Sequence, residues 1–163
     1  KEKAILILKK KSRDIALKKS DRVLGAGTVQ SYIHGNGSVG VLVHLASETD
    51  FVAKNEDFKK LAYDIAMHVA ASSPEYLKPE DISPEMKQKV YEMFKRDVAE
   101  SNKDTAMKEK IISGKMESYF AEQTLLNQPF IKNPEMTIAG LINEAVQKFG
   151  EKIEIVRFVR LSL

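Results

Sequence analysis

A glycine-rich turn between two β-rich segments, within residues 27–47, constrains the fold of this chain most. The turn at residues 34–38 reads HGNGS, and glycine and asparagine readily adopt the positive φ angles that tight hairpin turns need. In the second segment every alternate position is apolar, so that one face of a strand would be wholly apolar. These positions are Val39, Val41, Val43 and Leu45. The pattern predicts an antiparallel hairpin with one buried face.

Further along the chain the apolar spacing changes to three and four residues, which predicts amphipathic helices. Asn55, Ser83 and Thr137 are suitable N-cap residues for three of them, and Gly150 can close the last in a left-handed conformation. The apolar stripe of the first helix comprises Phe58, Leu61, Ala62, Ile65, Ala66 and Val69. A final strand is expected over residues 152–163.

The segment 84–126 is strongly charged and is predicted to be helical, with a break at Gly114. Residues 127–136 are predicted to form a loop. The sum is an α+β fold, with a small antiparallel sheet of about three strands packed against several helices. We expect residues 1–22 to be a remnant of an N-terminal helical domain with a basic linker. Residues 23–163 would then form the α+β core and dimerisation domain.

The charge of the chain is unevenly distributed. The net charge is +3, yet residues 1–22 hold nine Lys/Arg against three Asp/Glu, while the rest holds 17 basic and 20 acidic residues. A basic arm can contact nucleic acid, so a nucleic-acid-associated module is the alternative function. The arm has no interleaved aromatic residues, and the body lacks the basic surface of a nucleic-acid reader. We therefore favour a solvated helix and linker, and expect no direct nucleic-acid partner.

Residues for catalysis or metal binding are sparse. With no cysteine in the chain, disulfides and thiol catalysis are excluded. The three histidines are His34, His44 and His68, none with a second His at metal-ligand spacing. His44 could gather with Glu48 and Asp50 around a cation, but an outward-facing His44 with solvated acids is the favoured interpretation. There is no phosphate-binding loop or nucleophile elbow, so we expect neither an enzyme nor a cofactor. No apolar run reaches the roughly 20 residues of a membrane span, and the first residue is lysine, which suggests a fragment.

Phe51, in the stretch ETDFVAKNEDF, has two interpretations. Phe51 and Phe58 are seven positions apart, so one unbroken helix would bury both. However, Lys54 and Asn55 interrupt the apolar stripe, and asparagine suits a helix start better than a helix interior. A separate turn over residues 49–53 would leave Phe51 projecting. The pattern alone does not decide between a buried and an exposed ring.

Four stretches resemble the elongation factor Ts family in kind and in order, from about Gly27 to the C-terminus. They are VGVLVHLASETDFVAKNEDF at 39–58, DIAMHVAASSPEYL at 64–77, LLNQPFIKNPEMTI at 125–138 and EIVRFVRL at 154–161. The resemblance implies a guanine-nucleotide exchange factor of translation that binds elongation factor Tu carrying GDP. It implies a cytoplasmic location, or an organelle of bacterial descent, and no membrane partner.

The resemblance also implies which residues act. The element of this family that disturbs the magnesium bound to its partner matches Thr49, Asp50, Phe51 and Val52, followed by Ala53. Two departures from the family stand out. At most the last helix of its small N-terminal domain is present, at residues 1–12, and there is one glycine-turn hairpin where longer members have two related core halves. A homodimer would build an equivalent surface from two copies.

Overall fold

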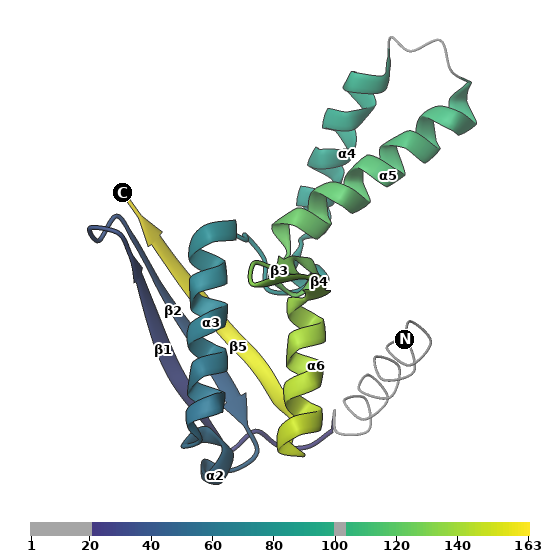
Figure 1. Ribbon diagram of the computed structural model, residues 1–163. Coiled ribbons are helices and arrows are strands. Elements are labelled where there is room, and N and C mark those ends of the chain that lie inside the picture. Colours follow the sequence, from purple (N-terminus) through teal and green to yellow (C-terminus); the bar gives the residue numbers. More distant parts are fainter. Residues whose placement is uncertain (1–20, 100–103) are drawn as a thin grey trace. The chain divides into compact units, whose positions relative to one another are not determined.

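The computed structural model describes residues 21–99 and 104–163, which fall into two compact units (Figure 1). Of the described residues, the first unit combines 21–73 with Pro129–Leu163, and the second lies within Pro74–Gln128. The helix and basic arm expected within residues 1–22 lie almost wholly outside the described residues.

The first unit is built on a three-stranded antiparallel sheet in the order β1-β2-β5. Its strands are β1 (Ala26–His34), β2 (Val39–Ser47) and β5 (Ile153–Ser162). Gly35 and Gly37 adopt φ angles of 58° and 90° in the β1–β2 turn, as the hairpin motif requires. The predicted hairpin and the predicted final strand are both confirmed.

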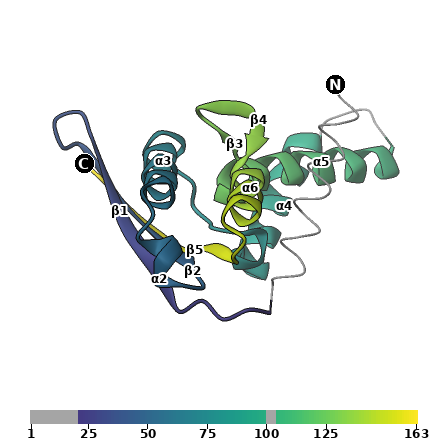
Figure 2. The same ribbon diagram turned by 60° about the horizontal axis from the view of Figure 1, so that its bottom comes forward.

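Two helices, α3 (Glu56–Ser72) and α6 (Ile138–Phe149), lie on the same face of this sheet (Figure 2). That face carries the buried side chains of β2, since Val41, Val43 and Leu45 are almost fully inaccessible to solvent. The remaining large, fully buried apolar residues of the unit are Phe58, Ile65, Val69 and Ile138. Apolar alternation on the strand and the three-to-four spacing on the helix thus meet in one core.

The predicted helix ends of α3 and α6 are confirmed in detail. The Asn55 side chain accepts a hydrogen bond from the Asp57 N–H at 2.8 Å, and the Thr137 hydroxyl accepts one from the Gly140 N–H at 3.1 Å. Gly150 has a φ of 73° and ends α6 in the left-handed conformation. Local sequence signals therefore define both helices.

The loop predicted over residues 127–136 is wrong, because part of it pairs as a second, two-stranded sheet. Its strands are β3 (Pro129–Phe130) and β4 (Asn133–Thr137). The Phe130 ring is buried beside the His68 imidazole, and His68 Nδ1 accepts a hydrogen bond from the Ile131 N–H at 3.3 Å. These contacts with α3 stabilise the hairpin, and no local sequence pattern predicts them.

The second unit is dominated by two helices, α4 (Pro84–Ala99) and α5 (Thr105–Gln123), flanked by the short 3-10 turns η1 (Pro79–Asp81) and η2 (Leu125–Asn127). The Ser83 hydroxyl caps α4 by accepting a hydrogen bond from the Met86 N–H, as predicted. The break expected at Gly114 is wrong, because α5 continues through it. One helical glycine costs only about 1 kcal/mol, which the flanking helix formers offset.

The α+β prediction is confirmed by the two units together. Among residues 21–99 and 104–163, no helix is long and apolar enough to cross a membrane.

Candidate functional site

The stretch that separates β2 from α3 contains a four-residue helix, α2 (Asp50–Ala53), with Phe51 exposed on it. The Phe51 side chain is 83% exposed, although it is a large apolar ring. The next two residues, Val52 and Ala53, are buried at 3% and 6% exposure. The structure thus favours the projecting ring over the buried one.

The break between α2 and α3 explains why Phe51 does not share a face with Phe58. Lys54 ends α2 in a helical conformation, but Asn55 is extended, with φ −67° and ψ 133°. This extended residue re-sets the helical phase, so that only Phe58 enters the core. The Phe58 ring is fully buried and meets Phe149 edge-on at a centroid distance of 5.9 Å.

Four residues bind the beginning of α2 to the segment that follows α6, and we call this set the clasp: Glu48, Thr49, Glu151 and Lys152. The Glu151 carboxylate accepts hydrogen bonds from the Thr49 N–H, at 3.0 Å, and from the Thr49 hydroxyl. In return, the Glu48 carboxylate accepts a hydrogen bond from the Lys152 N–H. It also pairs with Arg22, whose Nη1 lies 3.1 Å from Glu48 Oε2. The contacts are reciprocal, since each segment gives one carboxylate and one backbone N–H.

Thr49 has every polar atom engaged. Its carbonyl oxygen accepts hydrogen bonds from the Ser47 hydroxyl, at 3.1 Å, and from the Ala53 N–H, at 3.2 Å. Its N–H and hydroxyl donate to Glu151. Thr49 therefore fixes the direction in which the chain leaves β2.

Charged residues precede and follow Phe51 in the chain. Asp50 faces Lys54 at 3.4 Å, and both side chains are more than three-quarters exposed, so this pair contributes little to stability. At the start of α3, Lys148 Nζ lies 2.7 Å from the Asp57 carboxylate. This hydrogen bond and charge hold the pKa of Asp57 below its ordinary value. Phe51 is thus an exposed apolar ring on a segment whose neighbouring residues are charged.

The cation site considered around His44 is not formed within the described ranges, 21–99 and 104–163. No group of three His, Cys, Asp or Glu side chains is placed there to hold a metal ion. His44 is half-buried on β2, opposite Val29 and Arg157 in the sheet. Glu48 instead belongs to the clasp.

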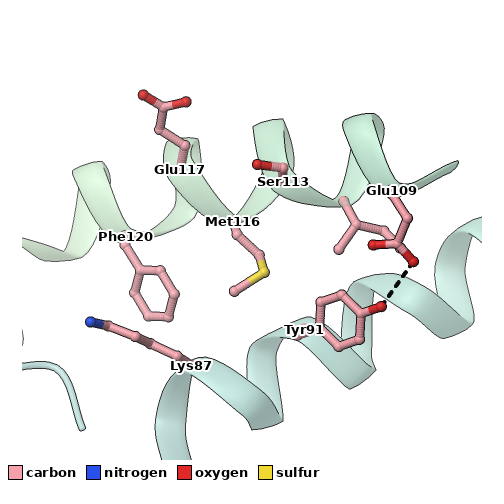
Figure 3. Close-up of a pocket in the computed structure, with 8 residues that line it drawn as sticks. Lys87, Tyr91, Glu109, Ser113, Met116, Glu117 and Phe120 are labelled. Carbon is pink, nitrogen blue, oxygen red and sulfur yellow. Dashed lines mark hydrogen bonds between the residues drawn. The ribbon is translucent and has the colours of Figure 1, made fainter. Parts of the chain in front are cut away.

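The second unit contains a groove of about 520 Å³ between α4 and α5 (Figure 3). Tyr91 donates a hydrogen bond to Glu109 at 2.9 Å across the groove, and this bond raises the pKa of the Tyr91 hydroxyl. The lining residues are Lys87, Tyr91, Glu109, Ile112, Ser113, Met116, Glu117 and Phe120. The groove therefore combines apolar side chains with charges of both signs.

The sequence singled out Thr49, Asp50, Phe51, Val52 and Ala53, and the structure brings them together on one short helix and its cap. The sequence pattern did not single out Glu151, Lys152 or Arg22. The hydrogen bond from Thr49 to Glu151 spans 102 positions, and a glutamate that follows a helix-ending glycine carries no local signal of such a contact.

Comparison with known proteins gives a consistent result. A family model described as Elongation factor TS matches residues 2–163. Elongation factor Ts of Carboxydothermus hydrogenoformans is 46% identical over 162 residues, which cover 99% of this chain and 75% of that protein. Elongation factor Ts of Heliobacterium modesticaldum is 45% identical with the same coverage. That of Thermodesulfovibrio yellowstonii is 48% identical over 161 residues, covering 99% of this chain and 80% of that protein.

Proposed function

Because this chain belongs to the elongation factor Ts family of translation elongation factors, we propose that it is a guanine-nucleotide exchange factor. It binds elongation factor Tu in its GDP-bound form and promotes release of GDP, so that GTP can replace it. No bond is made or broken by this chain in such a reaction, and we propose accordingly that it is not an enzyme.

The observation that supports this proposal most directly is the exposure of Phe51. Its ring projects from residues 49–53, the short segment between β2 and α3 that we call the corner. A free aromatic ring in water is unfavourable, and an aromatic ring is also a stiff body that can displace packed side chains. The bound magnesium of a nucleotide site requires near-ideal octahedral coordination and bridges phosphate to protein. A wedge that moves the supporting loops by about an ångström would loosen both metal and phosphate.

The five residues have different roles in this proposal. Phe51 is the wedge, and Asp50 beside it accepts hydrogen bonds from the partner. Val52 and Ala53 support the ring from the buried side, and Thr49 joins the corner to Glu151. By linkage, the factor by which this chain weakens GDP binding equals the factor by which GDP weakens binding of this chain.

The test is release of a fluorescent GDP from elongation factor Tu, with and without this chain and its Phe51→Ala variant. We expect acceleration by the parent chain, and a loss of roughly 2–4 kcal/mol of coupling in the variant, as for a central aromatic hot spot. Melting should be nearly unchanged, because Phe51 buries little surface.

Ile131→Ala is the matched control, since Ile131 is also an exposed apolar residue of the first unit and lies in the β3–β4 turn. The Ile131→Ala variant should accelerate GDP release as much as the parent chain does. If the Phe51→Ala variant still accelerates GDP release, the mechanism does not depend on the Phe51 ring. If the Phe51→Ala variant unfolds, the result contradicts the exposure of the Phe51 side chain.

We further propose that two copies associate through the outer face of the three-stranded sheet. This face carries exposed apolar residues on all three strands, and such patches mark interaction sites. They are Val29, Ile33, Leu42, Val159 and Leu161. Two twisted sheets of this kind pack face to face. Sedimentation should report a dimer that Leu42→Lys dissociates, whereas a monomer at all concentrations would contradict the proposal.

A further inference from the structure

The clasp joins Phe51 indirectly to a segment about one hundred positions later in the chain. We propose that Glu151 is a positioning residue for nucleotide exchange, which sets the direction of the Phe51 ring by holding Thr49. This inference rests on the proposed function, because release of GDP is its main readout.

A helix of four residues cannot hold its own orientation. Isolated helices of this length are unstable in water, since nucleation is unfavourable and few backbone bonds compensate for it. The Thr49 side chain makes no capping bond to α2. Its hydroxyl and N–H point instead to Glu151, so the first turn of α2 is fixed from outside.

The far side of α2 is fixed by burial. Val52 and Ala53 are almost fully inaccessible to solvent, whereas Phe51 between Thr49 and Val52 is exposed. With the N-terminal end held by Glu151 and the inner face by these two residues, rotation of α2 about its axis is restricted. A preorganised wedge does not lose binding free energy to ordering when it meets the partner.

The position of Glu151 is itself well defined. Gly150 takes a φ of 73° and its N–H bonds to the Val146 carbonyl at 3.0 Å, so the chain turns sharply at the end of α6. Lys152 is then held by its backbone N–H, which donates to the Glu48 carboxylate. The Lys152 side chain pairs with Glu154 at 3.2 Å, and this pair is not one of the clasp contacts. Glu151 is therefore presented to Thr49 by fixed contacts on both sides.

Three variants separate geometry from charge. Glu151→Gln can keep both contacts, because its carbonyl accepts from the Thr49 N–H and its amide donates to the Thr49 hydroxyl. Glu151→Ala removes both contacts, and Glu151→Asp keeps the charge but shortens the side chain. Glu154→Ala is the matched control, which removes an equal charge from the same segment but makes no contact with Thr49.

We expect Glu151→Ala and Glu151→Asp to lower the maximal rate of GDP release roughly tenfold (about 1.4 kcal/mol). Glu151→Gln and Glu154→Ala should match the parent chain. Affinity for nucleotide-free elongation factor Tu should change much less than the rate, since only the direction of the ring is disturbed. A merely structural role would instead lower rate, affinity and melting temperature together.

A second readout needs no partner. With 4-fluorophenylalanine at position 51, the fluorine resonance should shift and narrow in Glu151→Ala and Glu151→Asp as the ring becomes freer, and remain at the parent position in Glu151→Gln. If Glu151→Ala does not fold, the comparison of Glu151→Asp with Glu151→Gln tests the proposal.

The outcomes distinguish this inference from the function beneath it. If the parent chain does not accelerate GDP release, the proposed function fails, and the fluorine signal still supports or overturns the positioning role. If the parent chain accelerates release and Glu151→Ala and Glu151→Asp do so equally, the inference is overturned. Equal losses in Glu151→Gln or Glu154→Ala would also overturn it.

Discussion

The two units of this chain contain helices of similar length but bury very different amounts of apolar surface. In the first unit, α3 alone buries seven residues, among them Phe58, Ile65 and Val69. In the second, α4 buries Val90 and Val98, and the 19-residue α5 buries Ile112. The sheet offers a continuous surface to a helix, whereas two helices touch along a narrow seam. Burial thus stabilises the first unit far more than the second.

The largest expected effect comes from truncating one buried residue in each unit. Phe58→Ala should lower the free energy of unfolding by about 4 kcal/mol, because it leaves a large cavity in a closely packed core. Ile112→Ala should lower it by about 2 kcal/mol, because the seam between α4 and α5 can close around the smaller side chain. Urea unfolding measures both changes.

Hydrogen exchange sharpens this test. The α4 and α5 amides should exchange much faster in Ile112→Ala while the β2 amides keep their protection, since the second unit opens locally. An Ile112→Ala variant that is destabilised as much as Phe58→Ala, with uniform loss of protection, would contradict the difference between the units.

Two threonines give opposite, intermediate effects. Thr124, in the second unit, is fully buried, and its hydroxyl has no hydrogen-bond partner among the described residues. Thr124→Val should raise the free energy of unfolding by about 1 kcal/mol, because an unsatisfied buried hydroxyl is removed. Thr137→Val, in the first unit, removes the cap of α6 and should lower it by about 1 kcal/mol. Thermal unfolding that shows the same sign for both variants would refute this prediction.

The smallest expected effects are changes of stability with pH, one in each unit. Lys148 lowers the pKa of Asp57 in the first unit, so its contribution to stability is present above about pH 4 and is lost as pH falls through the folded pKa. The hydrogen bond to Glu109 raises the pKa of Tyr91 in the second unit. Its contribution is present below about pH 10 and is lost as pH rises through the folded pKa.

NMR titration of the Asp57 carboxyl carbon and the Tyr91 ring carbons checks both directions. Lys148→Gln should raise the pKa of Asp57 toward its ordinary value, and Glu109→Gln should lower the pKa of Tyr91 toward its ordinary value. A pKa of Asp57 that is unchanged by Lys148→Gln would remove the ion pair as the cause.

Much of the fold could be predicted because its signals are local. The β1–β2 turn, the Asn55 and Thr137 caps and the Gly150 helix end are each encoded within a few residues. The errors have non-local causes. The β3–β4 hairpin forms because Phe130 and Ile131 contact His68 across 63 positions, and Gly114 stays helical because one unfavourable residue cannot outweigh its neighbours.

The candidate site shows the same division. The sequence predicted which residues form the corner, but left the exposure of Phe51 open, because the phase of the helix depends on the extended conformation of Asn55. It could not predict the clasp, since neither Glu48 nor Glu151 differs locally from any solvated glutamate.

The clasp also has a consequence for the order in which a newly made chain matures. A ribosome synthesises Thr49 and Phe51 about a hundred residues before Glu151, and β2, the central strand, waits equally long for β5 to pair with its second edge. The exposed ring therefore exists early but gains its fixed direction only after Glu151 has been made. A nascent chain halted before Glu151 contains residues 49–53 but lacks the Thr49–Glu151 hydrogen bonds that orient the Phe51 ring.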